Sequence, residues 1–181
     1  MKLPNTKFWI CTDSHFGHPM LVEKGYRPAD YESRILAQLR TFVSPLDVLV
    51  HLGDVDFMNN EERDQQPALS LATIGAQRWL IRGNHDGKGL QSYLRAGWSM
   101  VCDGFYLYRS GLRIRFSHKP KKDRGDYDVN IHGHLHGMKE RYPELEYNDK
   151  QISLALEEND YKPWDLDVLI QEWKRKQEKP Q

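Results

Sequence analysis

Along the first half of the chain, short apolar runs alternate with amphipathic helical patterns. Runs rich in β-branched and aromatic residues predict strands over 7–12 (KFWICT), 47–52 (DVLVHL) and 77–82 (QRWLIR). Between the first two runs, apolar side chains recur at helical spacing from Ile35 to Val43, with Asp30 as the expected N-cap. Strands that alternate with helices in this way indicate an α/β fold.

Three further helices are predicted from capping residues and apolar spacing. One begins near Pro67, and another covers 88–97 and ends at Gly97. The third is a short terminal helix in which the spacing of Leu166 and Leu169 continues to Trp173. We expect one domain over residues 1–174, followed by a frayed tail over 175–181.

After Gly104 the pattern changes to one dominated by strands. Residues 105–118 form two alternating runs on either side of Ser110-Gly111, which predicts a β-hairpin. Two more runs, 127–133 (YDVNIHG) and 151–158 (QISLALEE), predict further strands.

The composition is that of a single globular domain. Of the 181 residues 39% are hydrophobic, and 26 basic residues balance 26 acidic ones, so net charge alone favours neither nucleic acid nor an anionic membrane as a partner. Cys11 and Cys102 fit no disulfide framework. The chain reaches Asp13 before any run of signal-peptide length, and no stretch approaches the roughly 20 apolar residues of a membrane span. We therefore expect a cytoplasmic protein with no membrane partner and no obligate protein partner.

Side chains that can bind metals cluster where the predicted strands end. Ligands of α/β sheets bind beyond the carboxyl ends of strands, so these side chains are expected to meet in one place although the sequence separates them. In chain order the five strand ends carry Asp13 and His15; Asp54; Asn84, His85 and Asp86; His118; and His134 and His136.

Seven of these residues are candidate metal ligands, and seven are too many for one tetrahedral ion. Their histidine nitrogens and carboxylate oxygens suit Zn, Mn or Fe better than Ca or Mg. Two ions that share a carboxylate fit the number of ligands, and Asp54, beside Gly53, is the natural bridge. The seven are Asp13, His15, Asp54, Asn84, His118, His134 and His136.

The segment IHGHLHG (131–137) places three histidines at alternate positions. In an extended strand they share one face, but the flanking glycines Gly133 and Gly137 allow the chain to bend as it leaves the sheet. His134 and His136 can therefore reach different metals, whereas His132 is expected to stay in the strand as a packing group or behind the ligands.

The order of motifs, D-S-H, G-D, G-N-H-D, S-H and G-H-L-H over residues 13–136, resembles the calcineurin-like metallophosphoesterase superfamily. The segment DSHFGH is most similar to small bacterial and phage-type members. The resemblance implies a four-layer αββα sandwich in a single domain, two divalent metal ions, and hydrolysis of phosphate esters by a metal-activated hydroxide. Mn²⁺ is the first choice of ion, with Fe, Zn, Ni or Co as alternatives.

The resemblance also implies roles for single residues. One ion would be held by Asp13, His15, Asp54 and His136, and the other by Asp54, Asn84, His118 and His134. His85 matches the histidine that donates a proton to the departing oxygen instead of binding metal.

One position departs from the protein-phosphatase branch, whose pattern is G-D-x-x-D-R-G. Here the second aspartate, Asp56, comes one residue earlier and no arginine follows it, so protein phosphatase activity is disfavoured. The carboxylate that supports His85 stays open between Asp56 and Asp86.

Two further residues are candidates for binding the substrate. His18 either lines the phosphate site or caps the loop after the first strand, and Arg27 either contacts phosphate or is an exposed arginine near a helix start. The basic run over 118–124 either guides a polyanion or is a solvated loop.

The expected function is hydrolysis of a small phosphorylated substrate, with phosphodiesters accepted at least as well as monoesters. The alternatives are a phosphomonoesterase, a nuclease that processes nucleic acid, and a metal-binding scaffold without catalysis; the substrate partner is expected to be a small phosphorylated molecule, a nucleotide or nucleic acid. An intact candidate proton donor at His85 argues against the scaffold.

Overall fold

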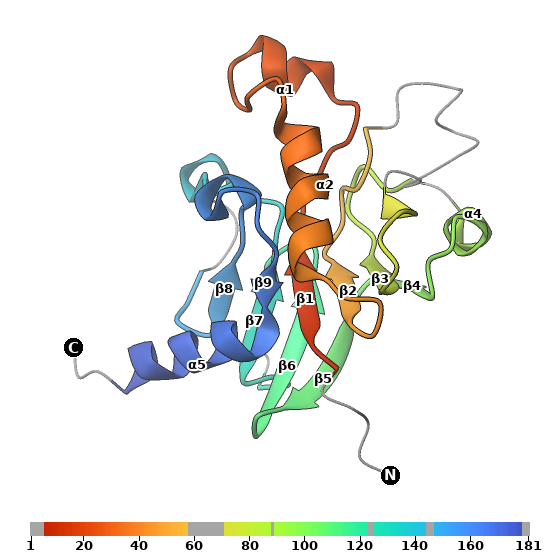
Figure 1. Ribbon diagram of the computed structural model, residues 1–181. Helices are drawn as coiled ribbons and strands as arrows, with labels where there is room; N and C mark the ends of the chain where they lie inside the picture. The colour runs from red at the N-terminus through yellow and green to blue at the C-terminus, as the bar shows by residue number, and fades with distance from the viewer. Residues whose placement is uncertain (1–5, 58–70, 88, 123–124, 144–146, 179–181) are drawn as a thin grey trace.

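The computed structural model describes residues 6–57, 71–87, 89–122, 125–143 and 147–178, which form two sheets and surrounding helices (Figure 1). In the first sheet, with strand order β4-β3-β2-β1-β9, strands β1 to β4 are parallel and β9 is antiparallel to β1. These strands are β1 (Phe8–Cys11), β2 (Val48–His51), β3 (Gln77–Ile81), β4 (Met100–Cys102) and β9 (Trp164–Asp165).

The second sheet has the strand order β5-β6-β7-β8. Strands β5 and β6 form an antiparallel hairpin, and β6, β7 and β8 are parallel. Ser110 and Gly111, with φ of 54° and 75°, make the hairpin turn that the sequence predicted. The strands are β5 (Phe105–Arg109), β6 (Leu112–Ser117), β7 (Val129–His132) and β8 (Gln151–Ser153).

Helix α2 packs on the outer face of the first sheet, where Ile35 and Leu39 belong to the same buried cluster as Trp9 and Leu49 (Figure 1). Helix α5 contributes Leu169 to the other cluster, which lies between the two sheets. The described helices are α1 (Pro19–Glu23), α2 (Tyr31–Phe42), α4 (Leu90–Arg95) and α5 (Leu166–Gln177), with 3-10 turns η2 (Lys139–Arg141) and η3 (Leu156–Asn159).

The core between the sheets follows from the alternation of side chains along each strand. Ile10 and Val50 point from the first sheet toward Ile114 and Ile131 of the second, and all four are fully buried. The opposite face of the first sheet packs against the helices. The structure is therefore the single-domain α/β sandwich with two sheets and outer helices that the sequence predicted.

Several boundaries differ from the sequence prediction. The predicted strand over 151–158 ends at Ser153 and turns into η3, where Leu156 packs into the helix-side core. Helix α5 continues to Gln177, past the expected boundary at 174, and the remaining tail residues 179–181 lie outside the described residues. Strands β4 and β9 are too short to be recognised from periodicity, and the helix predicted near Pro67 also lies outside the described residues.

The helices differ from membrane-spanning segments in length and hydropathy. Within the ranges that the structure describes, every helix is too short or too polar to cross a bilayer.

Candidate metal centre

The carboxyl ends of five parallel strands, β1, β2, β3, β6 and β7, meet at one edge of the sandwich. The Asp13 N–H donates to the Gly53 carbonyl at 2.9 Å, which joins the loops after β1 and β2. The His134 N–H donates to Asp13 Oδ2 at 2.9 Å, which joins the two sheets. The predicted convergence of residues from five strand ends is therefore present in the fold.

The backbone at this edge is held in an unusual conformation. Five of the eight non-glycine residues with positive φ in the described ranges are candidate ligands. Such residues cost free energy and persist where the surrounding structure enforces them, often at functional sites. The five are Asp13 (48°), His15 (46°), Asp54 (56°), His134 (71°) and His136 (48°).

Two glycines let the loops approach closely. A Cβ on Gly53, whose φ is +106°, would lie 2.6 Å from the Gly83 nitrogen and 2.7 Å from His118 Nδ1. A Cβ on Gly83 would collide with the carboxylate and backbone nitrogen of Asp54. Both positions therefore exclude any side chain, for a reason that is specific to the site.

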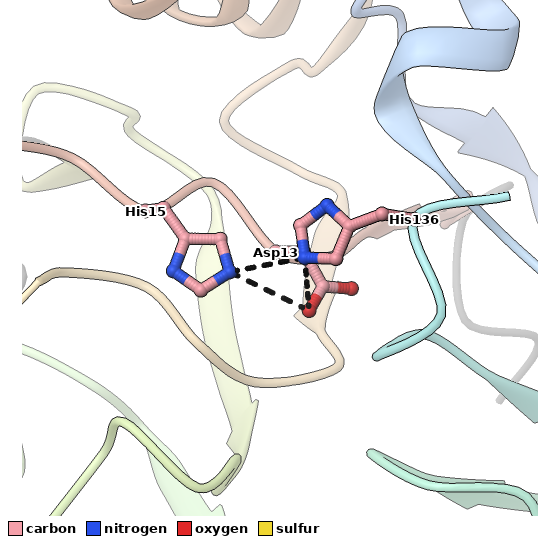
Figure 2. A group of neighbouring side chains, drawn as sticks. All are labelled: Asp13, His15 and His136. Atoms are coloured by element: carbon pink, nitrogen blue, oxygen red, sulfur yellow. Dashed lines mark hydrogen bonds and ion pairs between the residues drawn. The ribbon is translucent and has the colours of Figure 1, made fainter. Parts of the chain in front are cut away.

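The first donor group consists of Asp13, His15 and His136, drawn in Figure 2. The Nε2 atoms of His15 and His136 lie 3.2 Å apart, and they lie 3.9 Å and 3.7 Å from Asp13 Oδ1. The rings of the two histidines stack at 5.1 Å between centroids. Three ligand atoms from two different sheets thus point at one another.

The second donor group consists of Asp54, His118 and His134, with Asn84 beside it. His118 Nε2 lies 3.3 Å from Asp54 Oδ2, 3.1 Å from His134 Nδ1 and 3.1 Å from Asn84 Oδ1. His118 Nδ1 lies 2.8 Å from the Leu52 carbonyl, which accepts its proton and leaves Nε2 to face the other donors.

Asp54 lies between the two groups. Its Oδ2 is 3.8 Å from His15 Nε2 and 3.3 Å from His118 Nε2, while its Oδ1 accepts the His85 backbone N–H at 2.8 Å. The carboxylate is 2% exposed. It is therefore oriented by the loop after β3 and positioned between the donors of both groups.

Burial and close contacts shift the pKa values of several groups in the centre. Burial raises the pKa of Asp13 and lowers the pKa of His15. Burial also opposes ionisation of Asp54 and His118, but their mutual hydrogen bond and charge outweigh it, lowering the pKa of Asp54 and raising that of His118 to about 8. A cation among these groups would stabilise the charged carboxylates.

The donor set fits a divalent metal ion. Asp13 Oδ1 is buried without a hydrogen-bond partner while it faces two histidine nitrogens, and His118 Nε2 is surrounded by three donor atoms. Electron-rich atoms so close together need a proton or a cation between them. Imidazole and carboxylate ligands suit Mn, Zn, Fe and similar ions.

His85 also approaches the centre. Its ring centroid is 5.2 Å from that of His15, and a third group of donor atoms joins it to His15 and Asp54. Its assignment as a proton donor instead of a ligand therefore stays a prediction.

The carboxylate of Asp86 is used elsewhere. Its oxygens accept the backbone N–H groups of Asp54, Val55 and Gly83 at 2.6, 3.1 and 2.8 Å. Asp86 thus joins the loops after β2 and β3, and the support of His85 by Asp56 or Asp86 stays a prediction.

The two candidate substrate residues have different surroundings. His18 stacks on Phe57 at 3.8 Å between centroids and lies beside His15, and its side chain makes no capping hydrogen bond. Arg27 is only 2% exposed, so the expectation of an exposed arginine was wrong. Its guanidinium donates to Glu157 and to the carbonyls of Asp13 and Ser14, and substrate binding by either residue stays a prediction.

Two other histidines stay outside the donor groups. His132 is fully buried at the end of β7, as expected, with Nδ1 3.0 Å from the Gly133 carbonyl. His51 is fully buried at the end of β2, where its Nδ1 accepts the Gly53 N–H and its Nε2 lies 3.0 Å from Ser14 Oγ. His51 therefore joins the first two ligand loops instead of only packing.

Sequence reasoning missed two residues that hold ligands in place. Glu157 Oε1 lies 3.1 Å from His136 Nδ1, and Tyr31 Oη donates to the His15 carbonyl at 2.6 Å. Glu157 falls in the segment 151–158, which was predicted as a strand. Tyr31 is the first residue of α2 and is buried, so from the sequence it is expected only as a core residue. Neither residue belongs to a local motif, so no local signal could have identified them.

The chain is similar to known proteins in sequence and in fold. The chain is 24% identical over 174 residues to the uncharacterized protein MJ1445 of Methanocaldococcus jannaschii, covering 91% of this chain and 89% of that protein. The crystal structure of AQ665, a protein of unknown function from Aquifex aeolicus, matches with a TM-score of 0.72 and 25% identity, covering 92% of this chain and 99% of that one. A model of the calcineurin-like phosphoesterase family matches residues 6–179. The chain therefore belongs to the calcineurin-like phosphoesterases, metal-dependent hydrolases that act on phosphate esters.

Proposed function

We propose that this chain is a dinuclear metal-dependent phosphodiesterase that uses Mn²⁺ in preference to other divalent ions. The observation that carries the proposal is the position of Asp54, whose Oδ2 lies 3.8 Å from a nitrogen of one donor group and 3.3 Å from a nitrogen of the other. One carboxylate shared by two sets of ligands is the arrangement that a two-ion site needs.

The ligands divide between the two ions as the donor groups do. Asp13, His15 and His136 would hold the first ion, His118, His134 and Asn84 would hold the second, and Asp54 would contribute to both. When bound, two such ions polarise a phosphate ester and lower the pKa of a water molecule that attacks it.

The protein's own groups orient the ligand side chains and protonate the departing oxygen of the ester. The Leu52 carbonyl holds the His118 ring with Nε2 facing the other candidate ligands, where it would bind the second ion. The His85 backbone N–H holds Asp54, while its imidazole, beside His15 and 5.9 Å from the Phe57 ring, protonates the departing ester oxygen.

The charges around the centre favour a diester over a monoester. A diester carries one negative charge, whereas a monoester carries close to two at neutral pH and needs additional fixed cations. Two arginines that the sequence places close to candidate ligands are paired with carboxylates: Arg27 with Glu157 at 2.7 Å and Arg82 with Asp103 at 2.6 Å.

The comparison of bis(p-nitrophenyl) phosphate with p-nitrophenyl phosphate at saturating Mn²⁺ and near-neutral pH tests this preference. We expect kcat/KM for the diester to equal or exceed that for the monoester. A clear preference for the monoester would contradict the proposal, and Lys119→Met would then test whether that lysine supplies the second charge.

A nuclease is the second candidate, because nucleic acid is a polymeric diester. The described residues Lys119, Lys121 and Lys122 follow the ligand His118 directly, where they could contact a polyanion. Degradation of labelled DNA and RNA, compared with hydrolysis of a small diester or nucleotide, separates the two.

We further propose that the enzyme works in the cytoplasm, since Cys11 and Cys102 are both free thiols.

A further inference from the structure

Glu157 lies behind a candidate ligand, on the side away from the centre. It belongs to η3, 21 residues after His136, and its Oε1 lies 3.1 Å from His136 Nδ1. The opposite nitrogen of the same ring, Nε2, is the atom that faces His15 and Asp13. Glu157 therefore contacts the ligand ring only at the nitrogen that does not face the centre.

Arg27 holds Glu157 and the loop after β1 together. Its side chain is fully buried, and its Nε and Nη2 lie 2.8 and 2.7 Å from Glu157 Oε1. The same guanidinium donates to the Asp13 carbonyl at 2.7 Å and to the Ser14 carbonyl at 2.9 Å. One cation thus connects the carboxylate behind His136 to the backbone that carries Asp13.

The contacts also decide which nitrogen of His136 carries the proton. Nδ1 lies 3.1 Å from Glu157 Oε1 and 3.4 Å from Arg27 Nη2, and it cannot both donate and accept. Arg27 already donates to Glu157 and to two carbonyls, whereas a carboxylate can only accept. The shorter contact is therefore a hydrogen bond from His136 Nδ1–H to Glu157, which leaves Nε2 with a free lone pair.

We infer that Glu157, held by Arg27, is a positioning residue that fixes the tautomer and ring orientation of His136 for one of the two metal ions. The inference rests on the proposed two-ion function. In the second donor group a backbone carbonyl fixes the histidine tautomer instead of a carboxylate, because His118 Nδ1–H donates to the carbonyl of Leu52. Loss of the Glu157 charge should therefore weaken the binding of the ion at His136 and leave the binding of the other ion unchanged.

The test measures Mn²⁺ binding by equilibrium dialysis and elemental analysis in wild-type protein, Glu157→Gln and the exposed control Glu172→Gln. We expect two ions per chain in the wild type and the control. In Glu157→Gln we expect one ion at wild-type affinity and the other bound about 10- to 100-fold more weakly. Arg27→Lys, which keeps the charge but loses the planar fork, should produce a smaller loss at the same ion.

The possible results separate the inference from the proposed function. A wild type that binds fewer than two ions would overturn the two-ion proposal. Two ions bound by Glu157→Gln with unchanged affinity, or both weakened alike, would overturn only the role of Glu157.

A measurement on the unaltered protein covers the case in which the variant does not fold. In Zn²⁺-loaded wild type, ¹⁵N–¹H correlation spectra should show a proton on His136 Nδ1 and none on Nε2. A proton on Nε2 would overturn the inference.

Discussion

At the scale of single residues, the unusual feature of this protein is strain at its candidate ligands. Asp13 and His15 both adopt left-handed backbone conformations, and the loop that carries them is held by hydrogen bonds to three of its carbonyls from Arg27 and Tyr31. The candidate ligand atoms therefore point inward, because buried side chains outside the centre fix the backbone that carries them.

A substitution at His85 tests whether this histidine donates a proton, as proposed, or binds a metal ion. We expect His85→Asn to keep two Mn²⁺ per chain and to lose about 10² to 10⁴ in kcat for a diester with an alkyl leaving group, since it loses the proton donor. The loss should be smaller for a nitrophenyl ester, whose leaving group needs less protonation. Metal content and kcat for both substrates check this, and departure of a metal with the imidazole would make His85 a ligand.

The convergence of the candidate ligands could be predicted because each of them belongs to a short motif at a strand end. Asp54 and His118 could be identified from the sequence because a glycine or a buried strand precedes them. Glu157 and the buried state of Arg27 could not, because the pairing of these two residues joins segments 130 positions apart in the sequence. Such pairings depend on tertiary packing, which no local pattern encodes.

At the scale of elements, the centre depends on how closely the strand-end loops approach. The loops after β2 and β3 touch at Gly53 and Gly83, and Asp86 accepts backbone hydrogen bonds from both loops. The strands that supply the loops of the centre, β1, β2, β3, β6 and β7, were predicted because their apolar runs are distinct. The extent of β8 was not predicted, because Leu154 and Leu156 continue the apolar run past the end of the strand at Ser153 and into η3.

A pair of glycines in one loop tests this close approach. Gly83→Ala should lower metal occupancy and activity strongly, because the added methyl group collides with the Asp54 carboxylate. Gly87→Ala is the matched control, since a Cβ there meets nothing within 4 Å. Metal content and circular dichroism of both variants check the result, and equal occupancy in the two would show that the loops tolerate separation.

At the scale of the whole molecule, loops from both sheets supply the candidate ligands, so the geometry of the centre depends on the packing between the sheets. The fold class was predictable from the alternation of elements, but the order of strands in each sheet was not, because it follows from tertiary pairing. Asp47, which precedes β2 whereas Asp54 follows it, helps to hold the first sheet. It accepts hydrogen bonds from the Lys7 N–H, the Trp9 indole and the Ser44 N–H at 3.2, 3.0 and 2.9 Å.

Asp47 therefore predicts part of the acid sensitivity of the fold. Burial would raise the pKa of Asp47, but the hydrogen bonds from Ser44, Trp9 and Lys7 outweigh it and lower the pKa. Its contribution is thus complete above the unfolded pKa of about 3.9 and is lost as the pH falls through the lower folded pKa.

Asp47→Asn should lower the free energy of unfolding by about 1 to 3 kcal/mol at pH 7, because donors lose an acceptor oxygen. The difference in Tm from the wild type should shrink below about pH 4. Asp30→Asn, at an exposed site, is the control and should change Tm little. Thermal unfolding at pH 7 and pH 3.5 checks this. A Tm difference that does not vary with pH would show that ionisation of Asp47 does not stabilise the fold.

The central claim is that one carboxylate, Asp54, joins two metal sites built from both sheets. The most direct test is the number of Mn²⁺ ions bound per chain at saturation, measured by elemental analysis after equilibrium dialysis, in wild type and in Asp54→Asn. We predict two ions in the wild type and a loss at both sites in the variant, larger than the loss caused by His136→Ala. A wild type that binds no metal, or an Asp54→Asn variant that still binds two ions, would contradict the claim.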